Sequence, residues 1–166
     1  MLPIDKKTVT RSLAEFEKRL DVESCTFHYY YFVSKYYLSD GKDVEHWCLV
    51  AIDYFESLPF QHSAYESVFK KYIIEYYRQH GEVERAIAMV TLFISKIGYG
   101  DGIWMRYIFI YTELLLESKQ FDLALQKYQE VLALPLYREL PEDKKMRWDT
   151  IKQIIDQSIK VDKRQY

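Results

Sequence analysis

Residues 107–135 read YIFIYTELLLESKQFDLALQKYQEVLALP, and this stretch decides the fold of the chain. Apolar residues recur three or four positions apart in both of its halves, which predicts two helices. These residues are Ile108, Tyr111, Leu114 and Leu115 in the first half, and Phe121, Ala124, Tyr128, Val131 and Leu132 in the second. The polar residues 117–120 have the length of a helical-hairpin loop, so the two helices are expected to pack antiparallel. Pro135 cannot continue a helix and ends the second one.

A small residue recurs at the same place in three such pairs. Cys48, Ala86 and Ala124 each lie near the start of a second helix, and successive members are 38 residues apart. A small side chain that faces the first helix lets the two backbones approach closely. The recurrence therefore predicts three hairpins that are packed in the same way.

Polar breaks and turn residues divide the 166-residue chain into five segments. Five Gly and four Pro leave few breakpoints, which favours long helices over many short strands. Gly81 lies where a left-handed C-cap would end the first helix of the middle pair. We expect one all-α domain, 1–166, because the length suits a single core. Its segments are an amphipathic helix at 8–20, three helical pairs at 24–59, 62–98 and 102–135, and a last helix at 141–160.

This pattern resembles the tetratricopeptide (TPR) repeat, a helix-turn-helix unit with a small residue early in its second helix, an aromatic four residues later and a proline beyond it. Ala124, Tyr128 and Pro135 match these positions in the last pair. The family period is about 34 residues, so each unit here is longer. The resemblance implies a right-handed superhelix of antiparallel helix pairs, about three TPR-like hairpins, with 8–20 and 141–160 as capping helices. The residues that depart from the family's first-helix pattern are Lys70, Ile73 and Ile74 in the middle pair and Ile108, Tyr111 and Thr112 in the last.

The resemblance also implies a binding groove, because the first helix of each TPR pair lines the concave side of the superhelix. The family's groove positions fall on His28, Tyr31, Lys35 and Leu38 in the first pair, on Lys71, Glu75 and Arg78 in the second, and on Arg106, Phe109, Glu113 and Leu116 in the third. Aromatic platforms together with both signs of charge suit an extended or helical peptide of a partner protein.

Residues that could carry catalysis or hold a metal are scattered. The histidines at positions 28, 46, 62 and 80 do not share a helix face at the spacing that zinc ligands need. No Gly-x-Ser-x-Gly or His-Glu-x-x-His motif occurs in the chain. The Gly-rich residues 98–102 follow no predicted strand and precede no Lys-Ser/Thr, so a linker is favoured over a phosphate-binding loop. We expect a protein that is not an enzyme and has no catalytic residue, metal or cofactor.

The charge and the cysteine content limit the classes of partner and the cellular compartment that we expect for this protein. The formal net charge is −2, and the sequence has no cluster of basic residues. A nucleic-acid partner is therefore not expected, because no basic surface would attract its phosphates. The N-terminus becomes charged within five residues and has no long apolar stretch, so neither a secretory signal nor a membrane-spanning helix is expected. Cys25 and Cys48 stand alone and are expected to be reduced thiols, which favours a cytoplasmic protein.

Two classes of function are favoured, and an enzyme whose site is assembled from residues far apart in the sequence is a third alternative. The first is a non-enzymatic adaptor that binds a peptide or helix of a partner protein in the concave groove; small bacterial TPR chaperones and peptide-sensing regulatory domains are similar in fold. The alternative is a structural subunit whose aromatic surface is covered by a second copy, as a homodimer, or by a larger complex. Tyrosine rings that pack between helices would leave no recognition surface. The tyrosines concerned are at positions 29, 30, 36, 37, 76 and 77.

Overall fold

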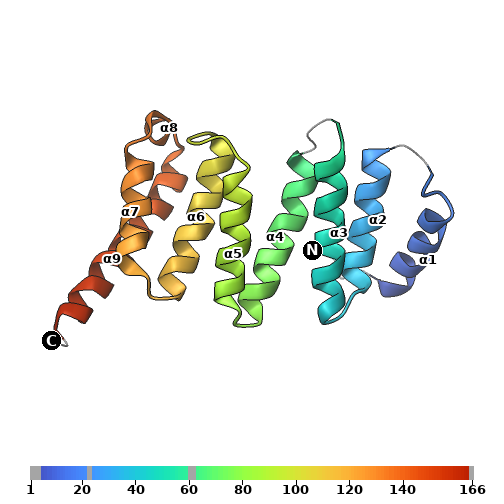
Figure 1. Ribbon diagram of the computed structural model, residues 1–166, viewed down its shortest axis with the longest axis horizontal. Helices are drawn as coiled ribbons and strands as arrows, with labels where there is room; N and C mark the ends of the chain where they lie inside the picture. Colours follow the sequence, from blue (N-terminus) through green and yellow to red (C-terminus); the bar gives the residue numbers. More distant parts are fainter. Residues whose placement is uncertain (1–4, 22–23, 60–62, 165–166) are drawn as a thin grey trace. The chain divides into compact units, whose positions relative to one another are not determined.

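The computed structural model describes residues 5–21, 24–59 and 63–164 (Figure 1). Within these residues the chain is helical and contains no strand, which confirms the predicted all-α class. The chain separates into two compact units, Met1–His80 and Gly81–Tyr166. The boundary falls in the turn predicted for the middle pair, where Gly81 has a φ of +71°, the left-handed conformation that glycine tolerates. The right-handed superhelix stays a prediction.

In the first unit, each helix packs against the next one along the chain. The helices are α1 (Lys6–Glu17), α2 (Cys25–Leu38), α3 (Lys42–Ser57) and α4 (Ser63–Gln79). Helix α1 starts before the predicted residue 8, because the Asp5 carboxylate caps it and accepts a hydrogen bond from the Lys7 backbone N–H at 3.1 Å. Ser24 caps α2 in the same way through the Phe27 N–H, at 3.3 Å.

Three phenylalanines form the centre of the first unit. Phe32 of α2, Phe55 of α3 and Phe69 of α4 are all buried, and each ring centroid lies 6.0 to 6.1 Å from the other two. Aromatic rings at this separation attract one another beyond the effect of the area that they bury. One contact cluster therefore joins three successive helices.

A buried lysine adds a polar connection between α3 and α4. The side chain of Lys70 is only 6% exposed, and its ammonium forms ion pairs with Glu56 of α3, at 3.4 Å, and with Glu66 of α4. A buried charge is tolerated only when partners compensate for its lost hydration. The two carboxylates therefore explain how a lysine can be buried between α3 and α4.

In the second unit, α5 packs on α6 and α6 on α7, and α9 packs on both α6 and α7. The helices are α5 (Val83–Ser95), α6 (Gly102–Glu117), α7 (Phe121–Leu132), the single turn α8 (Pro135–Arg138) and α9 (Glu142–Arg164). The Gly-rich loop ends at Asp101, whose carboxylate caps α6 by accepting from the Trp104 backbone N–H at 2.7 Å. This loop joins two helices, as expected. The short helix α8 has no counterpart in the sequence prediction.

The small residues lie inside, as predicted. Cys48, Ala86 and Ala124 all have 0% of their surface exposed. Ala124 belongs to a core cluster with Ile108 and Leu115 of α6 and with buried residues of α9. Its methyl group therefore lies where α6, α7 and α9 meet.

Replacing Ala124 by leucine is expected to lower the free energy of unfolding by about 1–3 kcal/mol, because the added carbons have no free volume between the helices. Urea denaturation followed by circular dichroism measures this change. The matched control is Ala88→Leu, since Ala88 is an exposed alanine of α5 in the same unit. Equal stability of the two variants would show that Ala124 does not limit helix approach.

Lys119 closes α6 in a conformation that usually belongs to glycine. Its φ is +60°, and it is the only non-glycine residue with positive φ in the described part of the chain. The Gln120 N–H donates to the Leu115 carbonyl at 2.8 Å and the Lys119 N–H donates to the Leu116 carbonyl at 3.1 Å. This pair of hydrogen bonds defines a Schellman cap, in which the left-handed position favours glycine.

The substitution Lys119→Gly is expected to raise the free energy of unfolding by about 0.5–1 kcal/mol, because it removes the left-handed strain of a residue with a Cβ. Gly81→Ala is the reverse substitution at a second residue with positive φ, and it should lower the free energy of unfolding. An added Cβ at Gly81 would meet no atom within 4 Å, so this variant tests the backbone strain alone. Both changes can be read from urea midpoints. A loss of stability in Lys119→Gly would contradict this account of the turn.

Candidate functional site

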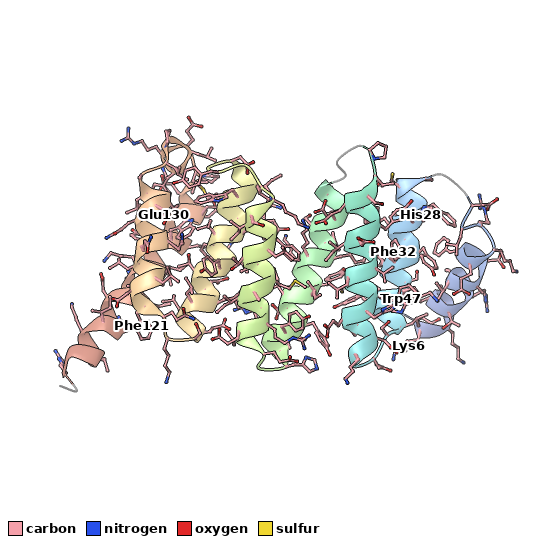
Figure 2. All side chains as sticks on the ribbon, in the orientation of Figure 1. Lys6, His28, Phe32, Trp47, Phe121 and Glu130 are labelled. Atoms are coloured by element: carbon pink, nitrogen blue, oxygen red, sulfur yellow. The ribbon has the colours of Figure 1, made fainter. Side chains whose placement is uncertain are left out.

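The structure places the predicted groove residue His28 inside the first unit. Figure 2 labels His28 on α2. The residue is 9% exposed, and its ring stacks on Tyr54 of α3, with ring centroids 4.6 Å apart and planes inclined by 20°. Its Nδ1 atom lies 2.9 Å from the Ser24 carbonyl oxygen at the start of α2. His28 therefore packs between α2 and α3, and its ring does not line an open surface.

Lys35 and Tyr31, also predicted to line the groove, connect α2 to both of its neighbours. The Lys35 ammonium lies 5.6 Å from the Tyr31 ring centroid and 4.9 Å from that of Trp47 on α3. It also pairs with Glu17 of α1 at 2.6 Å. An ammonium between two rings and a carboxylate is well compensated, since both kinds of contact attract a cation.

This side of α2 is thus partly covered by neighbouring helices, and binding at the predicted groove positions on α2 stays a prediction. The helix α1 packs against it, with Phe16 edge-on to Phe27 at 5.3 Å. Leu38, the fourth predicted position, is half-buried. The sequence could not reveal the covered side, because α2 carries aromatic residues on nearly every side.

The open side of α2 carries two other tyrosines. Tyr30 is 54% exposed and Tyr37 is 37% exposed. They lie seven residues apart, on the same side of the helix and about 10.5 Å apart along its axis. Tyr30 is two residues from the buried Phe32, which places the two side chains on roughly opposite sides of α2.

Two stacked tyrosine pairs hold α2 beside α4. Tyr29 stacks on Tyr65 with centroids 4.6 Å apart, and Tyr36 stacks on Tyr72 at 4.1 Å with planes only 9° from parallel. The Tyr65 hydroxyl also lies within hydrogen-bond distance of Thr26 Oγ1, at 2.8 Å. These four rings pack between helices, whereas Tyr30 and Tyr37 are exposed at the surface.

Burial changes the acidity of these phenols. It is the largest cause that raises the pKa of Tyr29, Tyr36 and Tyr72, and neighbouring tyrosines raise these pKa values further. For Tyr72 a hydrogen bond with Tyr37 has the same effect on the pKa. The hydroxyl groups of Tyr29, Tyr36 and Tyr72 therefore stay protonated at neutral pH and can donate hydrogen bonds.

On α4, two of the predicted groove residues are exposed. Lys71 lies two residues from both Phe69 and Ile73, which are buried, so it lies on the opposite side of the helix. Glu75 is one turn further along, and the third predicted residue, Arg78, is half-buried with Nη1 at 3.8 Å from the Glu75 carboxylate. We call the surface formed by Tyr30, Tyr37, Lys71 and Glu75 the tyrosine face.

In the second unit the predicted residues of α6 are divided between two environments. Arg106 is exposed and Glu113 is half-buried. The Phe109 ring lies edge-on to Trp148 of α9, with centroids 5.0 Å apart, and the Arg147 guanidinium lies 4.5 Å from its centre. Leu116 packs against the core cluster. Helix α9 thus covers part of the Phe109 ring, which was predicted to line the groove.

Three further features of the described residues concern metal binding, membrane crossing and thiol reactivity. They contain no group of three or more His, Cys, Asp or Glu side chains placed to hold a metal ion. No helix among them is long and apolar enough to cross a membrane. Burial raises the pKa of the Cys48 thiol to about 12, so this thiol is a poor nucleophile at neutral pH.

Neither protein-family models nor curated proteins nor solved structures gave a match to this chain. Its function is therefore inferred from the geometry of the molecule itself.

The raised pKa of Tyr72 predicts how stability changes at alkaline pH. Its phenol ionises in the unfolded chain near pH 10 but at higher pH in the folded protein. Its contribution is therefore present below about pH 10 and is lost as the pH rises further, by at most about 1.4 kcal/mol per pH unit. The loss is smaller than this limit because the side chain is only partly buried.

Tyr72→Phe keeps the ring stack and removes the ionisable group, so its unfolding free energy should fall less steeply above about pH 10 than that of the wild type. Urea unfolding at several alkaline pH values measures the slope, and Tyr99→Phe is the control because Tyr99 is 69% exposed. Parallel slopes for Tyr72→Phe and the wild type would contradict the assignment.

Proposed function

We propose that this chain is a non-enzymatic protein-interaction domain of TPR-like architecture, which binds a peptide segment of a partner protein on the tyrosine face of its first unit. The observation that carries this proposal is that two tyrosines of α2 pack against α4 while two others are exposed. Tyr29 and Tyr36 stack against α4, whereas Tyr30 and Tyr37, the next residue in each case, remain exposed.

The physical properties of this face suit peptide binding. Tyrosine offers a large contact area and a hydroxyl group while it loses little side-chain entropy, which is why tyrosine is enriched at binding hot spots. The stacked pairs beneath Tyr30 and Tyr37 fix the backbone positions of α2 and α4. A fixed platform reduces the ordering cost of binding.

The charged side chains beside the tyrosines would select one orientation of a bound peptide. Lys71 and Glu75 are both exposed and lie one turn apart on α4. Two opposite charges next to an aromatic platform favour one orientation of a peptide that carries the complementary pair. The face suits an extended or helical segment with apolar and charged residues.

The TPR-like interpretation has support of its own. The three small residues at 38-residue spacing are all completely buried, as close helix approach requires. Helices α2 and α4 are the first helices of two successive predicted pairs, and the tyrosine stacks hold them side by side. The superhelix of the TPR family has this neighbour relation. Reduced thiols at Cys25 and Cys48 fit a cytoplasmic location.

Selection from a random peptide phage-display library tests the proposal, because such a selection needs no identified partner. Peptides enriched on the whole chain should bind the variant with Tyr30→Ala and Tyr37→Ala at least about tenfold more weakly, since each tyrosine is expected to be a hot spot. Isothermal titration calorimetry with a selected peptide measures the affinity. Circular dichroism shows whether the variant keeps its helices.

The control is Tyr99→Ala, which removes a tyrosine that is 69% exposed in the second unit. This variant should bind the selected peptides as the wild type does. Failure to enrich any peptide, or equal binding by the Tyr30/Tyr37 variant and the wild type, would remove the basis for assigning binding to the tyrosine face.

A further inference from the structure

Helix α9 has an outer face that no described element of its unit covers. With 23 residues it is longer than α6, with 16, and α7, with 12. Its C-terminal part extends past the turn between α6 and α7 (Figure 1). The buried residues Trp148, Ile151 and Ile155 define its inner side. Its outer side carries apolar residues that are unusually exposed: Met146 at 65%, Ile154 at 42% and Val161 at 56%.

These three side chains belong to a row of exposed residues along one side of α9. Steps of three and four residues, with a single step of one between Gln153 and Ile154, keep the row on one side of a helix with 3.6 residues per turn. The row consists of Asp143, Met146, Thr150, Gln153, Ile154, Gln157, Val161 and Arg164, all of which are exposed.

The row has a mirror-like order. Read from either end, the intervals between its members are the same, with the midpoint between Gln153 and Ile154. Two copies of α9 that lie antiparallel about this midpoint would therefore place Met146 opposite Val161. In an antiparallel pair with two-fold symmetry, every such contact occurs twice.

The chemistry of three of the four opposed pairs matches in this arrangement, whereas the fourth sets Gln153 opposite Ile154. Asp143 would face Arg164 of the second copy, so each dimer would gain two pairs of opposite charges. Thr150 would face Gln157. The Thr150 hydroxyl already donates to the Met146 carbonyl at 3.0 Å, which leaves its oxygen free to accept from the glutamine amide. A parallel pair would instead bring the two Asp143 side chains together and the two Arg164 side chains together.

We propose that this row is a self-association surface, and that two copies of the chain pair antiparallel through α9. The contact runs about 32 Å along a helix about 10 Å wide, which gives roughly 300 Å² on each copy. This is less than the roughly 800 Å² per partner of a stable interface. The dimer is therefore weak and reversible, and salt weakens it further because opposite charges contribute to it.

Sedimentation equilibrium of the whole chain tests this proposal at low salt, from about 10 to about 500 µM, the range that suits a contact of this size. The wild type should show a reversible monomer-dimer equilibrium. Asp143→Arg and Arg164→Asp should each weaken association at least about tenfold, because each places like charges opposite one another. The double variant Asp143→Arg, Arg164→Asp should restore association to near the wild-type level.

Asp53→Arg is the matched control, since it makes the same charge change at an exposed residue of α3. It should associate as the wild type does. Circular dichroism checks that each variant keeps its helices. A wild type that stays monomeric at every concentration overturns the proposal, and so does a dimer that Asp143→Arg leaves intact. Single variants that weaken association without recovery in the double variant also overturn it, because the register would then be wrong.

Discussion

The contact among Phe32, Phe55 and Phe69 is the constraint on which the first unit depends. Each ring comes from a different helix, and each lies about equally far from the other two. Three helices joined at one point have little freedom to rotate about their own axes, because rotation of any one would withdraw its ring from the cluster. The orientation of α2 then follows, and it decides which tyrosines pack against α4 and which remain in contact with water.

Much of the fold was predictable from local pattern. Apolar periodicity, the position of Gly81 and the recurrence of Cys48, Ala86 and Ala124 correctly predicted helices and buried small residues. The start of α1 was missed because Asp5, its cap, precedes the apolar pattern. The short helix α8 was missed because four residues are too few for periodicity to show.

The candidate site was less predictable, and the reason differs between helices. On α4 the charged residues Lys71 and Glu75 mark the exposed side, so the sequence alone identifies it. On α2 aromatic residues surround the helix, and a uniformly aromatic helix has no side that periodicity can assign to water. Two lysines that form ion pairs with a neighbouring helix show the same limit. Lys70 needs Glu56 from α3, and Lys35 needs Glu17 from α1. Such pairings join residues 14 and 18 positions apart, which no helical spacing foretells.

The burial of Cys48 has a consequence for the dynamics of the first unit. A thiol with a pKa of about 12 and no exposed surface reacts with alkylating reagents only when α3 separates transiently from its neighbours. Cys25 is half-buried near the start of α2 and does not need so complete an opening. The two thiols thus report on the motion of the first unit. The rate of alkylation of Cys48, the slower of the two, measures how often the interior opens to solvent.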